Sequence, residues 1–225
     1  MGVNVASGQI TGTTTAMQYS LDSTNGTDGT WIDASAANTA VTFTEGSVYV
    51  RQKAVTTNNR LVATIAPAPL AITIGKTDIV AANDGTITGL TAGKTYEIHN
   101  GTEWADTTLA GTTITGLAAG NYKVREAASA STLVGAESNV VTIQNPAPLA
   151  ITIDKTDVVN SNDGTITGLT AGKTYEIYNG TEWSDATLTG TTITGLAAGT
   201  YKVREKASAD GLTPVGAESN TVTIS

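Results

Sequence analysis

The chain has 225 residues and a formal net charge of −8. An acidic surface repels the phosphate backbone, and no apolar run reaches the roughly 18 residues needed to span a bilayer, so we expect neither a nucleic-acid partner nor membrane insertion. Cysteine is absent, which excludes disulfides, thiolate metal sites and cysteine nucleophiles together.

Composition favours an all-β chain. Glycine numbers 24, charged residues are only 14% and aromatic residues 5%. Threonine and valine favour strands and glycine marks turns, so we expect many short strands. No segment has a sustained helical period.

The first 66 residues read as a diverged copy of a unit that recurs later. The sequence ITG at residues 10–12 recurs at 87–89, and Tyr19 matches Tyr96. Module one, residues 1–66, begins too late to own the apolar strand that opens the later units. We therefore expect it to lack most of its first strand and to have an unpaired sheet edge. Three explanations stay open: a cut in a longer array, completion by a neighbouring copy, or filling by Val3 and Val5.

Two closely similar units follow. PAPLAITI at residues 67–74 recurs at 146–153, an offset of 146 − 67 = 79. These are module two, residues 67–145, and module three, residues 146–225. Residues 149–153 alternate as a half-buried strand should, and Asn179-Gly180 tolerates the positive φ values of a type I′ hairpin. Six or seven strands in about 80 residues is the density of immunoglobulin-like sandwiches.

Short proline-rich linkers at residues 67–69 and 146–148 join the modules. Proline fixes φ and restricts the residue before it, so each junction is expected to be stiff. The sequence therefore predicts three tandem immunoglobulin-like β-sandwich modules in an elongated rod.

Two patterns resemble known families. LAAGTYKVRE at residues 196–205 is similar to the corner of fibronectin type III and related sandwiches, where a leucine, a glycine and a tyrosine close a turn into a strand. The resemblance implies a structural corner at Tyr122 and Gly120 and at Tyr201 and Gly199.

MQYSLDSTNGTDGTW at residues 17–31, with VYVRQKA at 48–54, resembles repeats of Gram-positive bacterial cell-surface and S-layer proteins. That resemblance implies a cell-surface stalk or array module, located on the bacterial surface or secreted. The unpaired edge of module one adds the expectation of self-association or contact with neighbouring modules of the same surface protein.

Tyr201, followed four residues later by Glu205 after an L-x-x-G corner, is similar to pilin-type domains of Gram-positive adhesins, in which a lysine and an asparagine join covalently beside a buried carboxyl group. Lys155, Glu205 and Asn220 are the matching trio in module three. Module one departs from the pattern with Gln52. Solvated charges at strand ends are the alternative interpretation.

Aromatic and acidic residues offer two other kinds of site. Trp31, Trp104 and Trp183 are candidates for stacking on a sugar; alternatively, each is the packing aromatic of its module. Asp22, Asp28, Asp84 and Asp163 are candidate oxygen ligands of a structural Ca²⁺ at a module junction, although NDG is first of all a turn. No other cofactor is expected, and the metal content stays open.

Catalysis is not expected. The single histidine, His99, is replaced by Tyr178 in module three, so no histidine pair or triad recurs. We predict a non-catalytic spacer or lattice module of a surface layer, fibre or adhesin stalk. The alternative is a carbohydrate- or protein-binding adhesin module that uses exposed aromatic residues.

Overall fold

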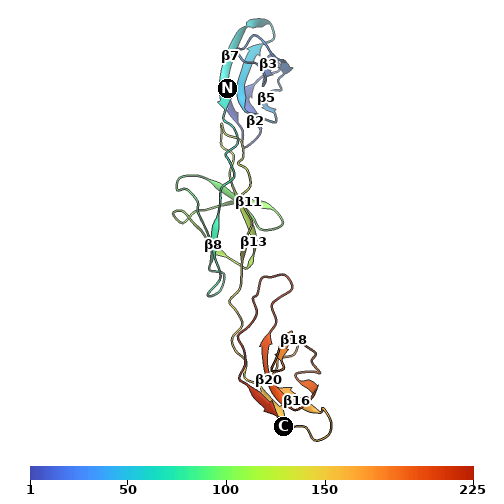
Figure 1. The fold of residues 1–225 in the computed structure, drawn as a ribbon. Coiled ribbons are helices and arrows are strands. Elements are labelled where there is room, and N and C mark those ends of the chain that lie inside the picture. The colour runs from blue at the N-terminus through green and yellow to red at the C-terminus, as the bar shows by residue number, and fades with distance from the viewer. The chain divides into compact units, whose positions relative to one another are not determined.

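The computed structural model describes residues 1–225. Strands and connecting loops make up the whole chain, and no helix is present (Figure 1). Module one holds β1 Gly2–Asn4, β2 Gln9–Thr13, β3 Met17–Ser20, β4 Ile32–Asp33, β5 Ala37–Ala40, β6 Gly46–Gln52 and β7 Val55–Ile65. Module two holds β8 Gly75–Thr77, β9 Gly85–Thr88, β10 Tyr96–His99, β11 Trp104–Thr107, β12 Ile114–Leu117, β13 Gly120–Glu126 and β14 Val141–Ile143. Module three holds β15 Asp154–Thr156, β16 Gly164–Thr167, β17 Tyr175–Tyr178, β18 Trp183–Ala186, β19 Ile193–Leu196, β20 Gly199–Glu205 and β21 Val222–Ile224.

One strand order occurs three times. Within each module the first, second and fifth strands form a three-stranded sheet, and the fourth, third, sixth and seventh form a four-stranded sheet. This order is that of a Greek-key sandwich with two sheets over one core. The predicted fold class is confirmed: the chain is all-β and consists of tandem immunoglobulin-like sandwiches, and each has seven strands.

The core of module three shows why this sequence forms a sandwich. On β20, Tyr201 and Val203 point inward, and their neighbours Lys202 and Arg204 point outward. The inward residues join Ile166 from the facing sheet in one buried cluster. Fully burying an isoleucine or valine side chain contributes roughly 1.5–3 kcal/mol. The apolar residues at every second position of each strand are buried between the two sheets and therefore stabilise their packing.

The expectation that module one lacks most of its first strand is wrong. β1 pairs with β2 through Val3 opposite Ile10, in the register that sets Lys155 opposite Ile166 in module three. β1, β8 and β15 each have three residues. In modules two and three, the first strand of the three-stranded sheet is the short segment that follows the apolar run at residues 70–74 or 149–153. In module one, Gly2–Asn4 is the counterpart of that segment.

The apolar run itself is not a ladder strand. Leu149 and Leu70 are each 88% exposed, and only the last residue of each run, Ile153 or Ile74, is buried. Ile153 is held by a side chain instead of a strand. Its N–H donates to Asn220 Oδ1 at 2.8 Å, and Asn220 Nδ2 donates to its carbonyl at 2.9 Å. The amide of Asn220 thus replaces one peptide unit of a ladder.

Each linker is bonded to a loop of the following module. Ala66 N donates to Ser131 O at 2.8 Å, and Leu133 packs against the core of module one. At the equivalent position in the next linker, Asn145 N donates to Leu212 O at 2.7 Å. Gln144 Nε2 adds a bond to the carbonyl of Gly211 at 2.8 Å. The loop after the sixth strand therefore fixes the linker that precedes its own module.

The chain divides into two compact units. The first comprises Met1–Lys76, Ile87–Thr115 and Asn121–Val141; the second comprises Thr77–Thr86, Gly116–Gly120 and Thr142–Ser225. Module one lies in the first unit and module three in the second. The module boundaries drawn from the sequence repeat stay predictions.

Candidate functional site: the outer faces of the four-stranded sheets

The outer face of the four-stranded sheet carries the most organised polar side chains of each module. On β17 of module three, Glu176 and Tyr178 alternate with the buried Tyr175 and Ile177. Strand register then sets Trp183 and Lys202 on either side of Tyr178. It sets Asp185 and Arg204 on either side of Glu176 in the same way. We call these six outward residues the outer ladder.

A tryptophan, an arginine and a carboxylate form a stack at the centre of this ladder. The Arg204 guanidinium lies 4.0 Å from the Trp183 ring centroid, close enough for cation–π attraction. Its Nε donates to Glu176 Oε2 at 2.7 Å. The Tyr178 ring lies 5.4 Å from the Trp183 ring, centroid to centroid. Each partner fixes the orientation of the indole.

The stack recurs in the other modules. In module two, Arg125 lies 4.0 Å from the Trp104 ring centroid and its Nε donates to Glu97 at 2.6 Å. In module one, Arg51 lies 4.0 Å from the Trp31 ring centroid. Its Nε and Nη2 donate to Gln18 Oε1 at 3.1 and 2.9 Å. A neutral amide therefore replaces the carboxylate in the diverged copy.

The three tryptophans lie outside the cores. Each is half-buried, and neither the cluster of module one nor that of module three contains one. Tyrosines such as Tyr175 and Tyr201 supply the large aromatic rings of the core in module three. Each indole is thus on the surface, but its arginine and, in modules two and three, an aromatic neighbour already cover part of it.

Ion pairs extend the ladder on both sides of the stack. Lys202 Nζ lies 2.8 Å from Glu218 Oε2 and lowers the pKa of that carboxyl. Lys206 Nζ lies 2.6 Å from Asp185. In module one, the equivalent Lys53 lies 2.8 Å from Asp33 and, with Gln18, lowers the pKa of Asp33. These pairs are exposed, so each contributes little to stability but orders the side chains around the stack.

Two pockets lie beside these outer faces. Tyr178, Trp183, Lys202 and Glu218 line one of about 250 Å³ in module three. A pocket of about 550 Å³ is lined by Ala6 of module one and by residues of module two that include Glu97, Asp106 and Ala127. Ala127 is the counterpart of Lys206, so Asp106 faces a small side chain where Asp185 faces an ammonium.

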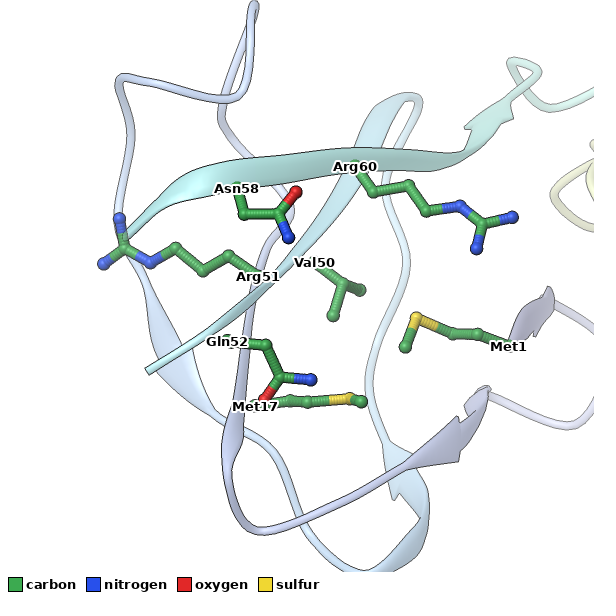
Figure 2. A pocket seen from close by; sticks show the side chains of 7 residues that line it. All are labelled: Met1, Met17, Val50, Arg51, Gln52, Asn58 and Arg60. Atoms are coloured by element: carbon green, nitrogen blue, oxygen red, sulfur yellow. The ribbon is translucent and has the colours of Figure 1, made fainter. Parts of the chain in front are cut away.

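Figure 2 shows a third pocket, in module one. Its volume is about 200 Å³, and the side chains of Met1 and Met17 point into the same space below strand β7 (Figure 2). Its lining consists of Met1, Met17, Val50, Arg51, Gln52, Asn58 and Arg60. The pocket combines an apolar floor with hydrogen-bonding side chains at its rim.

The trio suggested by the pilin-type resemblance has other partners. Lys155 Nζ pairs with Asp157, Glu205 pairs with Lys173 Nζ at 3.0 Å, and Asn220 holds the backbone of Ile153. The geometry does not join Lys155 to Asn220.

The predicted corner residues lie at the turn into the sixth strand. Tyr201 is 7% exposed and its hydroxyl donates to Ala197 O across the corner at 3.1 Å. A Cβ on Gly199 would lie 3.4 Å from the Tyr201 ring, an ordinary van der Waals contact. In module two, Tyr122 follows Gly120 at the start of β13, and burial raises the pKa of Tyr122.

The candidate calcium ligands organise turns. Asp163 accepts the N–H groups of Val159 and Asn160 at 2.8 and 3.0 Å, and the backbone N–H of Val80 and Ala81 likewise lowers the pKa of Asp84. Asp22 and Asp28 accept hydroxyl and backbone donors within the loop between β3 and β4. The chain has no group of three or more acidic or histidine side chains placed to hold a metal ion.

Sequence reasoning missed the arginines and Glu176 of the stack. The signal was present: in YKVRE the arginine lies three positions after an inward tyrosine, so a period of two places it outward, next to the neighbouring hairpin. The contact between arginine and tryptophan could not be predicted from the sequence. It depends on which strands flank β17 and on the register in which they pair with it.

Comparison with protein-family models gave no match, and comparison with curated proteins gave none. Among solved structures, the FN1–FN3 domains of chicken CNTN1 are similar at 14% identity and a TM-score of 0.30, over 92% of this chain and 89% of that one. Murine CEACAM1b is similar at 11% identity and a TM-score of 0.38, over 72% of this chain and 98% of that one. The immunoglobulin-like assignment rests on the strand order and the shared cores, and no function is carried over from either protein. No helix is long and apolar enough to cross a membrane.

Proposed function

We propose that the chain is a non-catalytic spacer of a bacterial cell-surface protein, in which each junction is stiffened by bonds to a loop of the following module. One observation carries the proposal: both linkers are bonded at the same position to the loop of the following module, at Ala66 and at Asn145. A freely hinged linker needs no such bonds. Repetition of one strand order supports a role in which length, rather than one specialised site, is the useful property.

Solution scattering of the full chain tests the spacer. A rigid array gives a radius of gyration well above the roughly 17 Å expected for one compact domain of this length. Replacing both Gln144 and Asn145 by glycine removes side-chain bonds to Gly211 and Thr213 and restores backbone freedom. The distribution of interatomic distances should then broaden. A compact particle, or a distribution unaffected by the double variant, contradicts the proposal.

A binding role is the second candidate, favoured by the pocket between Tyr178 and Trp183. A sugar stacks its apolar face on an aromatic ring, and Lys202 and Glu218 would bond its hydroxyls. Against this role, the Arg204 guanidinium already lies over the Trp183 ring and covers part of the surface on which a sugar would stack. Binding on a glycan array that Tyr178→Ala abolishes, with Tyr49→Ala in module one as the control, would favour this role over the spacer.

Self-association belongs to the same proposal. The pocket of module one offers a place for a segment of another copy, and a surface lattice needs such a contact.

A further inference from the structure

Each module carries the sequence Asn-Gly-Thr between its third and fourth strands. The asparagines are Asn25, Asn100 and Asn179, and no other asparagine of the chain is followed two residues later by serine or threonine. Asn-X-Ser/Thr is the acceptor sequence for N-linked glycans. The motif therefore occurs once per module, at one place in the fold.

The local geometry is the same in the three copies. In module three, Thr181 donates to Asn179 Oδ1 from its N–H at 3.0 Å and from its hydroxyl at 2.7 Å. The corresponding distances are 3.1 and 2.7 Å at Asn100 and 2.8 and 2.6 Å at Asn25. All three asparagines are exposed. These bonds use the amide oxygen and leave the amide nitrogen without a hydrogen-bond partner.

The threonine takes part in this turn, but an asparagine turn in this chain does not require a threonine two residues later. The type I′ turn expected at Asn179-Gly180 is not formed: Gly180 has a φ of 95°, whereas Asn179 is not among the residues with positive φ. Two other asparagine turns, at Asn83 and Asn162, adopt positive φ and carry glycine two residues later. The chain thus builds asparagine turns without threonine elsewhere.

Module one keeps the motif on a different backbone. In modules two and three it fills the short loop that closes a hairpin. In module one it lies in a longer loop, where Asp28 accepts the hydroxyls of Ser23 and Thr24 and Gly26 packs closely against Tyr49 and Asn59. The same acceptor geometry is therefore reached on two frameworks.

We propose that Asn25, Asn100 and Asn179 are acceptors of N-linked glycans. The proposal rests on the proposed export of the chain, because such transfer takes place at the non-cytoplasmic face of a membrane that the chain crosses. The sugar donor is an oligosaccharide linked to a lipid through pyrophosphate. The asparagine nitrogen Nδ2 attacks the anomeric carbon and forms the C–N bond. The anomeric C–O bond breaks, the lipid pyrophosphate leaves with the electron pair, and the Nδ2 proton passes to a base of the transferase.

The test is an acceptor assay on the folded full chain. The chain is incubated with an oligosaccharyltransferase and its lipid-pyrophosphate-linked oligosaccharide, and intact mass is measured. We expect three glycans per chain. Thr27→Ala, Thr102→Ala and Thr181→Ala should each remove one glycan, while the matched Thr→Ser variants should keep it. Serine retains both the hydroxyl bond of the turn and the acceptor sequence. Asn25→Asp, Asn100→Asp and Asn179→Asp keep an oxygen acceptor for the turn but lack Nδ2, so these variants separate loss of the acceptor from damage to the turn.

A peptide spanning residues 97–105 serves as the control for enzyme activity. A chain that stays bare while this peptide accepts sugar overturns the proposal. Glycans that survive the Thr→Ala changes overturn it as well, and a bare asparagine overturns it for that site. The assay requires no spacer function, so its failure leaves the scattering result standing, and a compact particle in scattering leaves the acceptor result standing.

Discussion

The arginine of the outer ladder is the residue on which the surface order of each module depends. Arg204 contacts an indole with its guanidinium and a carboxylate with Nε, and about a quarter of its side chain is exposed. Partial burial lowers the local dielectric, so these interactions are worth more here than between fully exposed groups. The tryptophan, in turn, is held in one orientation by the arginine.

Replacing Arg204 by alanine should therefore loosen Trp183 and cost module three about 1–2 kcal/mol, the sum expected of a cation–π contact and a partly buried ion pair. Tryptophan emission measured in a Trp31→Phe, Trp104→Phe background reports Trp183 alone. We expect the emission of the Arg204→Ala variant to shift toward that of a solvated indole, with a smaller shift for Arg204→Lys, which keeps the charge but not the planar stack. An unchanged spectrum and unchanged melting would refute the stack.

The sequence predicts the orientation of some residues of the outer ladder but not of others. The alternation of YKVRE predicts that Tyr201 is inward and Arg204 outward, and both are. Trp183 was harder to assign, because it begins its strand and no alternation precedes it. Its outward position follows from its pairing with Tyr178 across the hairpin, a tertiary fact.

At the scale of the element, the apolar run before β15 shows where pattern reading failed. Alternation of apolar residues predicts a ladder strand, but Leu149 is exposed and the ladder begins only at Asp154. The backbone bonds of Ile153 go to one asparagine side chain. A local pattern cannot reveal such a clamp, since its two members are 67 residues apart.

Changing Asn220 to alanine removes both bonds to Ile153 and leaves a part-buried N–H and C=O without partners. The expected cost is about 1–3 kcal/mol. Hydrogen exchange at the Ile153 amide should become faster, while exchange at Val203 in the middle of β20 should change only through global stability. Asn139→Ala is the matched variant in module two, because Asn139 holds Ile74 in the same way. Equal protection of Ile153 in the variant and the parent would rule out the clamp.

Turns held by carboxylates make the modules sensitive to acid. Lys155 and the backbone of Ser225 lower the pKa of Asp157 to about 2, and the N–H groups of Val159 and Asn160 lower the pKa of Asp163. The folded pKa lies below the unfolded value near 3.9, so the stabilisation is fully present above that value. It is lost as pH falls toward the folded pKa.

The melting temperature should thus vary little with these groups between pH 5 and 8 and fall between about pH 4 and 2. Asp157→Asn should lower stability at neutral pH and flatten the acid limb, because asparagine does not titrate. Exposed Glu45, which has no ion-pair partner, offers the control as Glu45→Gln. Parallel acid limbs for parent and Asp157→Asn would argue against the role of Asp157.

At the scale of the whole molecule, the three copies of one sandwich can be compared position by position. In module one, Val50 lies opposite Arg60 on β7. In module three, the carbonyl of the counterpart Val203 accepts the N–H of Ser219, so Arg60 and Ser219 occupy equivalent positions. Asn58 therefore corresponds to Ala217, whose N–H donates to Pro148 O at 2.9 Å. Since Met1 corresponds to Ile153, the pocket between Met1 and Asn58 in module one matches the place where the PAPLAITI segment lies in module three.

The sequence predicts self-association through an unpaired sheet edge of module one, and this correspondence indicates a different surface of the same module. The first strand of module one is present, so we expect docking at the neighbouring pocket and not in place of a missing strand. We expect a PAPLAITI segment from a second copy to bind there, with its backbone carbonyl accepting the Asn58 N–H and its apolar side chains covering Met1 and Met17. Strand-like addition of this kind supplies main-chain bonds for affinity.

A synthetic PAPLAITI peptide should accordingly bind the chain with one site per molecule in calorimetry and reduce any self-association seen in sedimentation. Asn58→Pro removes the donating N–H at an edge position where proline is tolerated and should abolish binding. Thr56→Ala, on the same strand β7 as Asn58, serves as the control. A scrambled peptide of the same composition tests whether apolarity alone suffices. Binding that survives Asn58→Pro, or a chain that stays monomeric at high concentration and ignores the peptide, would remove assembly through this pocket and leave the spacer with its internal junctions only.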